Sequence, residues 1–427
     1  MLKTLIKDVY VVKPDGTTPL TNIMLDGDKI AAIGDVPEDF RPGKVIDGKN
    51  HLATPGFVNA HTHTSMTLLR SYADDMALMD WLNNMIWPIE AKMNEEDIYW
   101  GAMLAVLEMV RSGTTTFADM YGPYMNRVAE ATMDAGIRGV LSRGIIGVAP
   151  DGEQKLQENV ELYKDYHGAN NGKITVMFGP HAPYTCPPEF LKKVARAAQD
   201  LGAGIHIHMH ETKTEVEDSL KQYGKRPFAW VEETGIFDND HVLAAHCVHL
   251  DDNDIEIIKK HKIAVAHNPG SNMKLASGFA PVTRLLKEGV VTALGTDGAS
   301  SNNNLDMLEE VNLAAMLHKV NEYDPLAVPA FEALKMGTEY GAQAVGIEGL
   351  GRLEAGYKAD ITLWNMNSPA WFPRNNLVSL LVYAANASSA DTVICGGQVI
   401  MEKNELKTLD EERICYEAQR CADRLNK

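Results

Sequence analysis

From residue 57 onward, short apolar runs alternate with stretches whose apolar residues recur at helical spacing. This alternation restricts the fold more than any other feature, because repeated strand–helix units form parallel sheets. Helical patterns follow the apolar runs, for example at Pro187–Leu201, Asp251–His261 and Leu305–His318. The predicted strands end near eight positions: Asn59, Asp119, Gly144, Pro180, His208, His246, His267 and Asp297. Eight such units predict an α/β fold of the TIM-like (β/α)8 barrel type.

An open, doubly wound sheet is the alternative fold for this alternation. Its dinucleotide-binding form carries a G-x-G-x-x-G turn after the first strand. The sequence contains no such motif, so the barrel is the preferred interpretation.

The two ends of the chain have β character without intervening helices. Short β-type runs separated by turns occupy residues 1–56, and similar runs return in residues 353–427 before a charged helical stretch at Asp410–Leu425. We expect these two parts to fold together as a small β-sandwich domain, while residues 57–352 form the barrel.

Charge and cysteine content restrict the partners and the compartment. A formal net charge of −18 repels phosphate backbones, so we expect no nucleic-acid partner. No apolar stretch approaches the length of a membrane span, and Met1–Asp8 carries charges where a signal peptide needs an apolar core. The five cysteines lack C-x-x-C spacing, which favours reduced thiols. We expect a cytoplasmic protein without a membrane partner, and the sequence leaves room for a homo-oligomer.

His61 and His63 lie at the end of the first predicted barrel strand. Side chains at positions i and i+2 of a strand point to the same side, so the two imidazoles would converge. Such a pair alone is more often a surface or core feature than a metal site, since short motifs carry false positives. Its meaning therefore depends on the other strand ends.

Later strand ends supply further metal-binding side chains. In a (β/α)8 barrel, functional residues gather at the C-terminal ends of the strands. His246 ends the sixth predicted strand and Asp297 ends the eighth. The fifth strand offers three candidates, among which its pattern does not choose: His206, His208 and His210. Imidazole and carboxylate ligands of this kind suit Zn²⁺ or Fe²⁺.

Several motifs occur in a fixed order along nearly the whole chain. They are Pro55–His63, His208–Thr212, Ala245–Leu250, His267–Asn272 and Gly295–Gly298. In this order they resemble the amidohydrolase superfamily. Two more stretches, Trp87–Glu90 and Gly179–Tyr184, resemble the S-adenosylhomocysteine/5′-methylthioadenosine deaminase family within it.

The resemblance implies that His61, His63, His208 and Asp297 bind one divalent metal ion. We expect Zn²⁺, with Fe²⁺ or Mn²⁺ as alternatives. The strand-end analysis agrees for three of these ligands, and the resemblance selects His208 on the fifth strand. Some superfamily members hold a second metal with a carboxylated lysine on the fourth strand. Lys173 lies at the wrong, N-terminal end of that strand, so we expect a single metal.

The resemblance also implies a reaction. The enzyme would convert the adenine of 5′-methylthioadenosine or S-adenosylhomocysteine, and also adenosine or 5′-deoxyadenosine, to hypoxanthine with release of ammonia. An aromatic ring resists attack until a ring nitrogen is protonated, so the reaction needs both an acid and a base. We assign Glu211 as the acid at N1, and His246 with Asp297 as the groups that orient and deprotonate the water. Glu211 and Asp297 would therefore also contact the substrate.

Three further residues are implied to bind the substrate. Glu90 would contact the ribose hydroxyls, His181 the nucleoside, and Arg143 the amino-acid carboxylate of S-adenosylhomocysteine. An arginine–carboxylate pair suits that role. The loop Ile146–Gly152 lacks the second arginine that some members use there, which argues against a strong preference for the charged tail.

Two other functions compete with this interpretation. One is a different deaminase or chlorohydrolase on the same scaffold, acting on guanine, a triazine or a cyclic amidine. The other is a non-catalytic scaffold, which the complete set of metal-binding residues disfavours. The Met- and Trp-rich segment 66–93 fits either a helical core face or a lid over the site.

Overall fold

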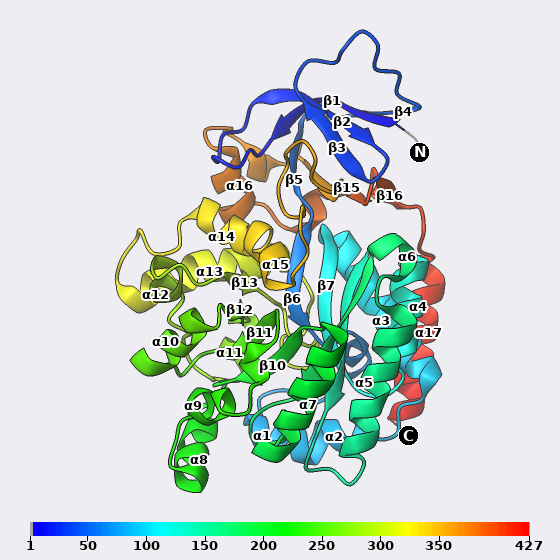
Figure 1. Cartoon of the computed structure of the whole chain (residues 1–427). Helices are drawn as coiled ribbons and strands as arrows, with labels where there is room; N and C mark the ends of the chain where they lie inside the picture. The colour runs from blue at the N-terminus through cyan, green and yellow to red at the C-terminus, as the bar shows by residue number, and fades with distance from the viewer. Residues whose placement is uncertain (1–2, 427) are drawn as a thin grey trace.

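Eight parallel strands form the barrel in the computed structural model, which describes residues 3–426 (Figure 1). They are hydrogen-bonded in the order β13-β12-β11-β10-β9-β8-β7-β6. The strands are β6 (Phe57–Thr62), β7 (Thr114–Tyr121), β8 (Arg138–Ile145), β9 (Ile174–Pro180), β10 (Ile205–Met209), β11 (Val242–His246), β12 (Ala264–His267) and β13 (Thr292–Leu294). The first and last strands meet where the Asp297 N–H donates to the His61 carbonyl, at 2.9 Å. The predicted eight-stranded barrel is confirmed.

Helices surround the strands and bury their outer faces. Every residue of β6 and β10 is buried, as expected for parallel strands covered on both sides. Side-chain caps fix several helix starts: Asn94 and Asp251 each form a capping box with the aspartate three residues later. The main helices are α3 (Glu95–Arg111), α4 (Met125–Ala135), α5 (Gly152–Tyr166), α6 (Ala169–Gly172), α7 (Pro188–Leu201), α8 (Lys213–Tyr223), α9 (Pro227–Glu232), α10 (Asp252–Lys260), α11 (Pro269–Lys274), α12 (Val282–Lys287), α13 (Met307–Glu322), α14 (Ala330–Met336) and α15 (Glu339–Ala344).

Both chain ends contribute to a second sheet of nine strands, which confirms that the two ends fold together as a separate β unit. Its order is β17-β16-β15-β14-β5-β1-β2-β3, and β4 pairs with β1. The strands are β1 (Lys3–Val11), β2 (Leu20–Asp26), β3 (Lys29–Ile33), β4 (Lys44–Asp47), β5 (His51–Pro55), β14 (Ile361–Asn365), β15 (Ala390–Cys395), β16 (Gln398–Glu402) and β17 (Glu405–Leu406). We call this unit the β module. Helix α16 (Leu377–Tyr383) lies within its second half, and α17 (Glu411–Leu425) returns to pack beside α3 (Figure 1).

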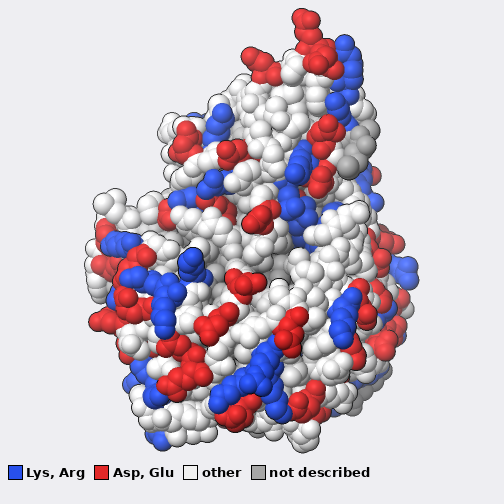
Figure 2. All heavy atoms as spheres, in the orientation of Figure 1, with Lys and Arg blue, Asp and Glu red and all other residues white. Residues whose placement is uncertain are grey.

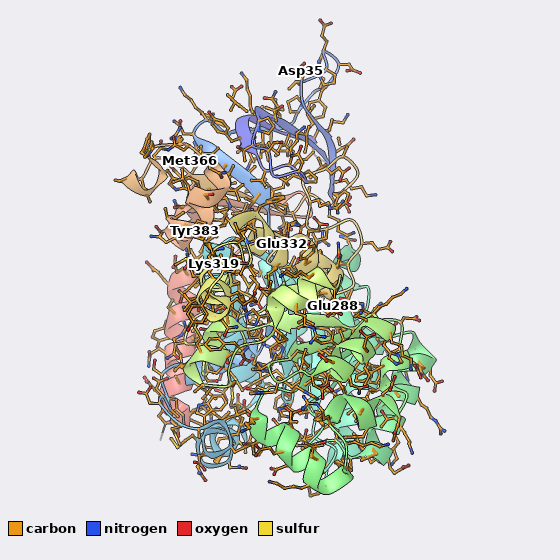
Figure 3. The ribbon with its side chains drawn as sticks, turned by 90° about the vertical axis from the view of Figure 1, so that its left-hand side faces the viewer. Asp35, Glu288, Lys319, Glu332, Met366 and Tyr383 are labelled. Carbon is orange, nitrogen blue, oxygen red and sulfur yellow. The ribbon has the colours of Figure 1, made fainter. Side chains whose placement is uncertain are left out.

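A single residue, Gly56, separates β5 of the β module from β6 of the barrel. A Cβ atom at this position would lie 2.3 Å from the Thr115 side chain, so only glycine allows the close approach. In Figure 3, Asp35 marks the far tip of the β module, Met366 lies at the left-hand side of the same module, and Glu288 lies on the helical layer of the barrel. The first barrel strand is therefore a direct continuation of the second sheet.

A buried ion pair ties the β module to the base of the barrel. Arg138 at the start of β8 donates two hydrogen bonds of 2.9 Å to the Asp360 carboxylate just before β14. The two side chains are 4% and 1% exposed. The boundaries between the β module and the barrel, at residues 56 and 353, stay a prediction. Met1, Leu2 and Lys427 lie outside the described residues.

Acidic and basic side chains alternate over the face in Figure 2, where neither sign forms a continuous area. Among residues 3–426, no helix combines the length and the apolar character needed to cross a bilayer.

Candidate active site

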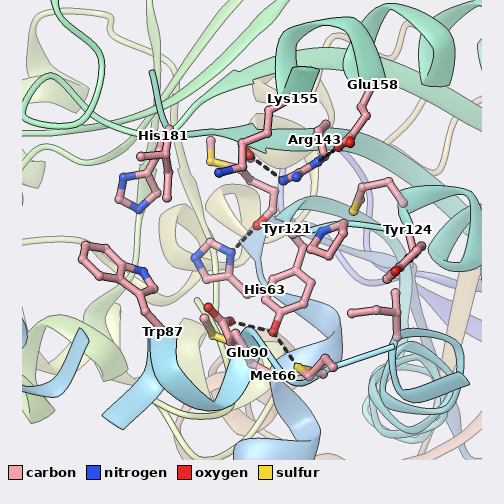
Figure 4. Close-up of a pocket in the computed structure, with 18 of the residues that line it drawn as sticks. His63, Met66, Trp87, Glu90, Tyr121, Tyr124, Arg143, Lys155, Glu158 and His181 are labelled. Carbon is pink, nitrogen blue, oxygen red and sulfur yellow. Dashed lines mark hydrogen bonds and ion pairs between the residues drawn. The ribbon is translucent and has the colours of Figure 1, made fainter. Parts of the chain in front are cut away.

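A cavity of about 990 Å³ opens at the C-terminal ends of the barrel strands (Figure 4). Its floor comes from strand ends, and its walls come from the segment after β6 and from α5. This placement agrees with the general position of active sites in (β/α)8 barrels. The lining includes most of the predicted site residues: His63, Glu90, Arg143, His181, His208, Glu211, His246 and Asp297.

The three histidines predicted to bind a metal use their Nδ1 atoms for other contacts. Nδ1 of His61 lies 2.8 Å from Nε2 of His206, and Nδ1 of His208 lies 2.8 Å from the His181 carbonyl. Nδ1 of His63 contacts the Met120 carbonyl. Such contacts orient metal-binding imidazoles and select their tautomer. With Nδ1 occupied, Nε2 is the candidate ligand atom of each of the three rings.

These Nε2 atoms converge on one point. The ligand atoms of His61, His63 and His208 lie within 4.8 Å of one another. Nε2 of His61 is buried without a hydrogen-bond partner, which is costly unless a ligand occupies that direction. Burial lowers the pKa of His61 to about 4 and that of His208 well below its usual range, so both rings are neutral, the form that binds metals. Burial also opposes protonation of His63, but the Asp297 carboxylate outweighs it and raises the pKa of His63 to about 9, so a metal ion would have to displace that proton. The residues therefore fit a divalent metal ion.

Asp297 completes this cluster from the other side of the barrel seam. Its Oδ1 lies 3.1 Å from Nε2 of His63 and 3.5 Å from Nε2 of His61. Its Oδ2 accepts hydrogen bonds from the hydroxyls of Ser271 and Ser301, at 2.6 and 3.0 Å. The backbone of Asp297 has a φ of +60°, an unusual value for a non-glycine residue that is found at functional sites. Burial opposes its ionisation, but the histidine contacts outweigh this and hold the pKa of Asp297 well below the ordinary value.

His246 lies at the end of β11, and its Nδ1 is 2.9 Å from the side-chain oxygen of Asn272. If Nδ1 carries the proton, Nε2 faces the cavity as a proton acceptor. Asn272 belongs to α11 (Pro269–Lys274), a short helix that follows β12. Ser271 and Asn272, the last two residues of the motif His267–Asn272, thus orient Asp297 and His246, a role that was not assigned to them from the sequence.

Glu211 lies just beyond β10, and its carboxylate is 3.9 Å from Nε2 of His246. The backbone N–H groups of His210 and Glu211 donate to the two carboxylate oxygens of Glu215, at 3.0 and 2.9 Å. This contact fixes the turn that directs Glu211 toward the cavity. Burial raises the pKa of Glu211, and the negative charge of Asp297 adds to the effect. A carboxyl group with a raised pKa is suited to transferring a proton near neutral pH.

The other histidines of the fifth strand have different surroundings. His206 is buried deeper in the barrel, where it contacts His61. His210 follows the strand, and its Nδ1 lies 3.0 Å from the His249 carbonyl. His267 lies 3.1 Å from His318 of α13. Lys173 donates to the Gly136 carbonyl, outside the cavity lining.

Residues 64–93 form a helical wall over the cavity. It comprises η1 (Thr64–Leu69), α1 (Leu78–Trp81), η2 (Leu82–Ile86) and α2 (Trp87–Glu90). Trp81 and Leu82 are buried and also line the cavity, so the segment serves both as core and as cavity wall. Glu90 ends this wall, and the Tyr121 hydroxyl donates to its Oε1 at 2.6 Å (Figure 4).

Two cations lie at the far end of the cavity. Nε of Arg143 is 2.7 Å from Oε2 of Glu158, and Nζ of Lys155 is 2.7 Å from Oδ1 of Asp151. Figure 4 shows Lys155 beside Arg143. The loop Ile146–Gly152 contains no second arginine, but Lys155, one turn into the following helix α5, lines the same end of the cavity. Its i,i+4 pairing with Asp151 is also typical of an ordinary surface ion pair.

Comparison with known proteins places this arrangement in a family. Residues 52–400 match the model of the amidohydrolase family. A "5-methylthioadenosine/S-adenosylhomocysteine deaminase" of Pelotomaculum thermopropionicum is 54% identical over 415 residues, covering 96% of this chain and 95% of that protein. A protein of the same name from Thermoanaerobacter pseudethanolicus is 50% identical and covers 99% of both chains.

Solved structures share the fold over nearly the whole chain. An adenosine deaminase of Xanthomonas campestris with bound zinc superposes with a TM-score of 0.94 at 33% identity, covering 99% of this chain and 98% of that one. A zinc complex of atrazine chlorohydrolase from Arthrobacter aurescens gives 0.92 at 25% identity, covering 98% and 100%.

The chain belongs to the amidohydrolase family and is a metal-dependent hydrolase. Among its relatives, the two bacterial deaminases match it over almost their entire length.

Proposed function

We propose that this protein deaminates 5′-methylthioadenosine and S-adenosylhomocysteine, with His61, His63, His208 and Asp297 holding one Zn²⁺. The main supporting observation is the position of Glu211, a buried carboxyl group with a raised pKa, beside the convergent metal-binding side chains. Hydrolysis at a ring carbon needs an acid at that place. Relatives at 50% identity or more that carry this deaminase name add independent support.

The metal ion, when bound, supplies Lewis acidity and lowers the pKa of a water molecule toward neutrality. Nε2 of His246 accepts a proton from the attacking water, and Asn272 keeps the ring in the required orientation. Glu211 delivers a proton to N1 of adenine, which makes C6 electrophilic. The water oxygen bonds to C6, and the amino nitrogen takes the proton that His246 received. The C6–N bond then breaks and ammonia leaves, while the remaining hydroxyl proton passes to the Glu211 carboxylate as the hypoxanthine carbonyl forms. Ser271 and Ser301 hold the Asp297 carboxylate in place throughout.

The cavity accommodates a nucleoside whose base faces the metal-binding cluster. Glu90 accepts hydrogen bonds from the ribose hydroxyls, and His181 contacts the nucleoside. The 5′ substituent then extends toward Arg143 and Lys155. Two cations suit the carboxylate of S-adenosylhomocysteine. We therefore propose a stronger preference for the charged tail than the sequence alone suggested.

Turnover of a substrate panel tests the proposal directly. The purified, zinc-loaded protein is given adenosine, 5′-methylthioadenosine, S-adenosylhomocysteine, guanine and a triazine, and ammonia release is followed with the ultraviolet change from adenine to hypoxanthine. We expect the two thioether nucleosides to have the highest kcat/KM. Turnover of guanine or the triazine without any adenine nucleoside would assign a different hydrolase activity. A protein that binds no metal and shows no turnover would instead be a scaffold.

A further inference from the structure

Tyr121 lies at the end of β7 and is 5% exposed, yet it contacts the substrate cavity. Its hydroxyl donates to Oε1 of Glu90 at 2.6 Å and lies 3.6 Å from the Met93 sulfur. Glu90 belongs to the helical wall, whereas Tyr121 belongs to the barrel. This hydrogen bond therefore joins the cavity wall to the rigid strand that also carries Met120, the partner of His63.

The contact leaves part of the Glu90 carboxylate free. Within residues 3–426, no hydrogen-bond donor contacts Oε2 of Glu90, and an ionised carboxylate oxygen can accept two hydrogen bonds. The hydroxyl of Tyr121 stays protonated, because burial and the negative charge of Glu90 raise its pKa well above the ordinary value. Toward an ionised Glu90, the Tyr121 hydroxyl is therefore the donor. It holds the carboxylate at Oε1, and Glu90, which lines the cavity, keeps its other acceptor sites for a ligand.

We propose that Tyr121 is a positioning residue that makes Glu90 selective for a vicinal diol, the paired 2′- and 3′-hydroxyls of a ribonucleoside. Glu90 ends a helix of four residues, and its flexible side chain would otherwise sample several rotamers. Held by Tyr121, the carboxylate is already oriented for two hydroxyl donors before the substrate arrives. The inference rests on the proposed nucleoside deamination.

Two substrates and Tyr121→Phe test this role. In the wild-type enzyme, replacing 5′-methylthioadenosine by its 2′,3′-dideoxy analogue removes the diol and should lower kcat/KM by about tenfold to hundredfold, the usual cost of a hydrogen bond to a charged group. In Tyr121→Phe, that penalty should shrink to less than about threefold, because an unfixed Glu90 no longer distinguishes the two substrates. The loss on the natural substrate should fall on KM, with kcat nearly constant.

Tyr163→Phe is the matched control. The Tyr163 hydroxyl donates to the Leu201 carbonyl at 2.8 Å, outside the cavity lining, so the variant loses one similar hydrogen bond. It should keep the wild-type penalty for diol removal. Metal content and thermal melting of both variants confirm that the fold is intact.

A double variant separates positioning from a direct effect of Tyr121. If Tyr121 acts through Glu90, Tyr121→Phe/Glu90→Gln should be no worse than Glu90→Gln alone. If Tyr121→Phe lowers kcat/KM equally for both substrates, the diol penalty is unchanged. That result would overturn the inference while leaving the deaminase assignment intact. A wild-type enzyme indifferent to diol removal would also overturn it. Absence of turnover on every adenine nucleoside would remove both proposals.

Discussion

Asp297 contacts His61 twice across the seam between the last and the first barrel strand. Its backbone N–H donates to the His61 carbonyl at 2.9 Å, and its Oδ1 lies 3.5 Å from the His61 Nε2. The contact that closes the barrel therefore also involves two of the proposed metal ligands. A ligand that binds only the folded state stabilises it, so a metal held by these residues should strengthen the closure itself.

Removal of the metal should abolish activity and lower thermal stability together. Chelation should release about one metal ion per chain, and Zn²⁺ should restore turnover. His208→Ala should prevent metal binding, because the remaining ligands leave the coordination incomplete. Elemental analysis and melting curves provide the measurement. His261→Gln, which changes a histidine paired with Glu232 outside the cavity, should keep its metal; full metal retention in His208→Ala would refute the assigned ligand set.

Glu211→Gln should lower kcat by about 100-fold to 10,000-fold, the usual contribution of a positioned acid. The metal content should not change, because Glu211 is not among the proposed ligands. Steady-state absorbance assays and elemental analysis measure the two quantities. Glu189→Gln, at an 83% exposed side chain, should behave as the wild type. A Glu211→Gln enzyme with normal turnover would assign the proton transfer to another group.

Lys155→Met should reduce kcat/KM for S-adenosylhomocysteine by about tenfold, because a hydrogen bond between charged groups is lost. The same variant should turn over 5′-methylthioadenosine within about twofold of wild type, since that substrate has no carboxylate. Asp151→Asn frees Lys155 from its partner, so it should favour the charged substrate. The ratio of the two specificity constants is the measurement, and equal losses on both substrates would contradict the assignment.

As the pH falls, nucleoside binding should begin to weaken at a higher pH than it would if Glu90 had the pKa of an ordinary glutamate. Burial raises the pKa of Glu90 above 4.5, although the Tyr121 hydrogen bond opposes the shift. The ionised carboxylate accepts the ribose hydroxyls, so KM should rise as the pH falls through the raised pKa. The 2′,3′-dideoxy analogue should lack this rise. Parallel pH profiles of KM for the two substrates would exclude Glu90 as the cause.

Asp360→Asn should destabilise the fold by about 3 to 5 kcal/mol, because the buried Arg138 guanidinium loses its counter-charge. The melting temperature should drop by several degrees, whereas kcat and KM of the folded enzyme should not change. Glu417→Gln breaks a more exposed pair with Arg420 and should change stability by less than about 1 kcal/mol. Equal effects of the two substitutions would argue against the buried pair as a tie between the two sheets.

The strand ends were predictable because their chemistry is local. His61, His63 and Asp297 each follow an apolar run, and a barrel brings the C-terminal ends of its strands together independently of the conformation of the loops. The open choice on the fifth strand reflects a limit of that pattern. His206 and His208 share a face of β10. Only their depth in the barrel, which residue spacing does not reveal, separates His208, which lines the cavity, from His206, which does not.

Residues outside the strands could not be predicted in the same way. Lys155 reaches the cavity only because α5 folds back over the strand ends, and Asn272 only because α11 forms beside His246. Tyr121 lies two residues past the predicted strand end at Asp119, and its pairing with Glu90 depends on where the helical wall crosses β7. These contacts follow from tertiary packing rather than from local propensity.

The single-residue junction at Gly56 has a consequence for the order of folding. β5 pairs with β14, and Thr54 accepts a hydrogen bond from Trp364, 310 residues later in the chain. At ribosomal speeds of 5 to 20 residues per second, that partner emerges about 15 to 60 seconds after β5. Most of the chain is therefore synthesised before β14, which anchors β5 and with it the following strand that carries His61, is available. Metal acquisition should accordingly be a late, essentially post-translational event in the life of each molecule.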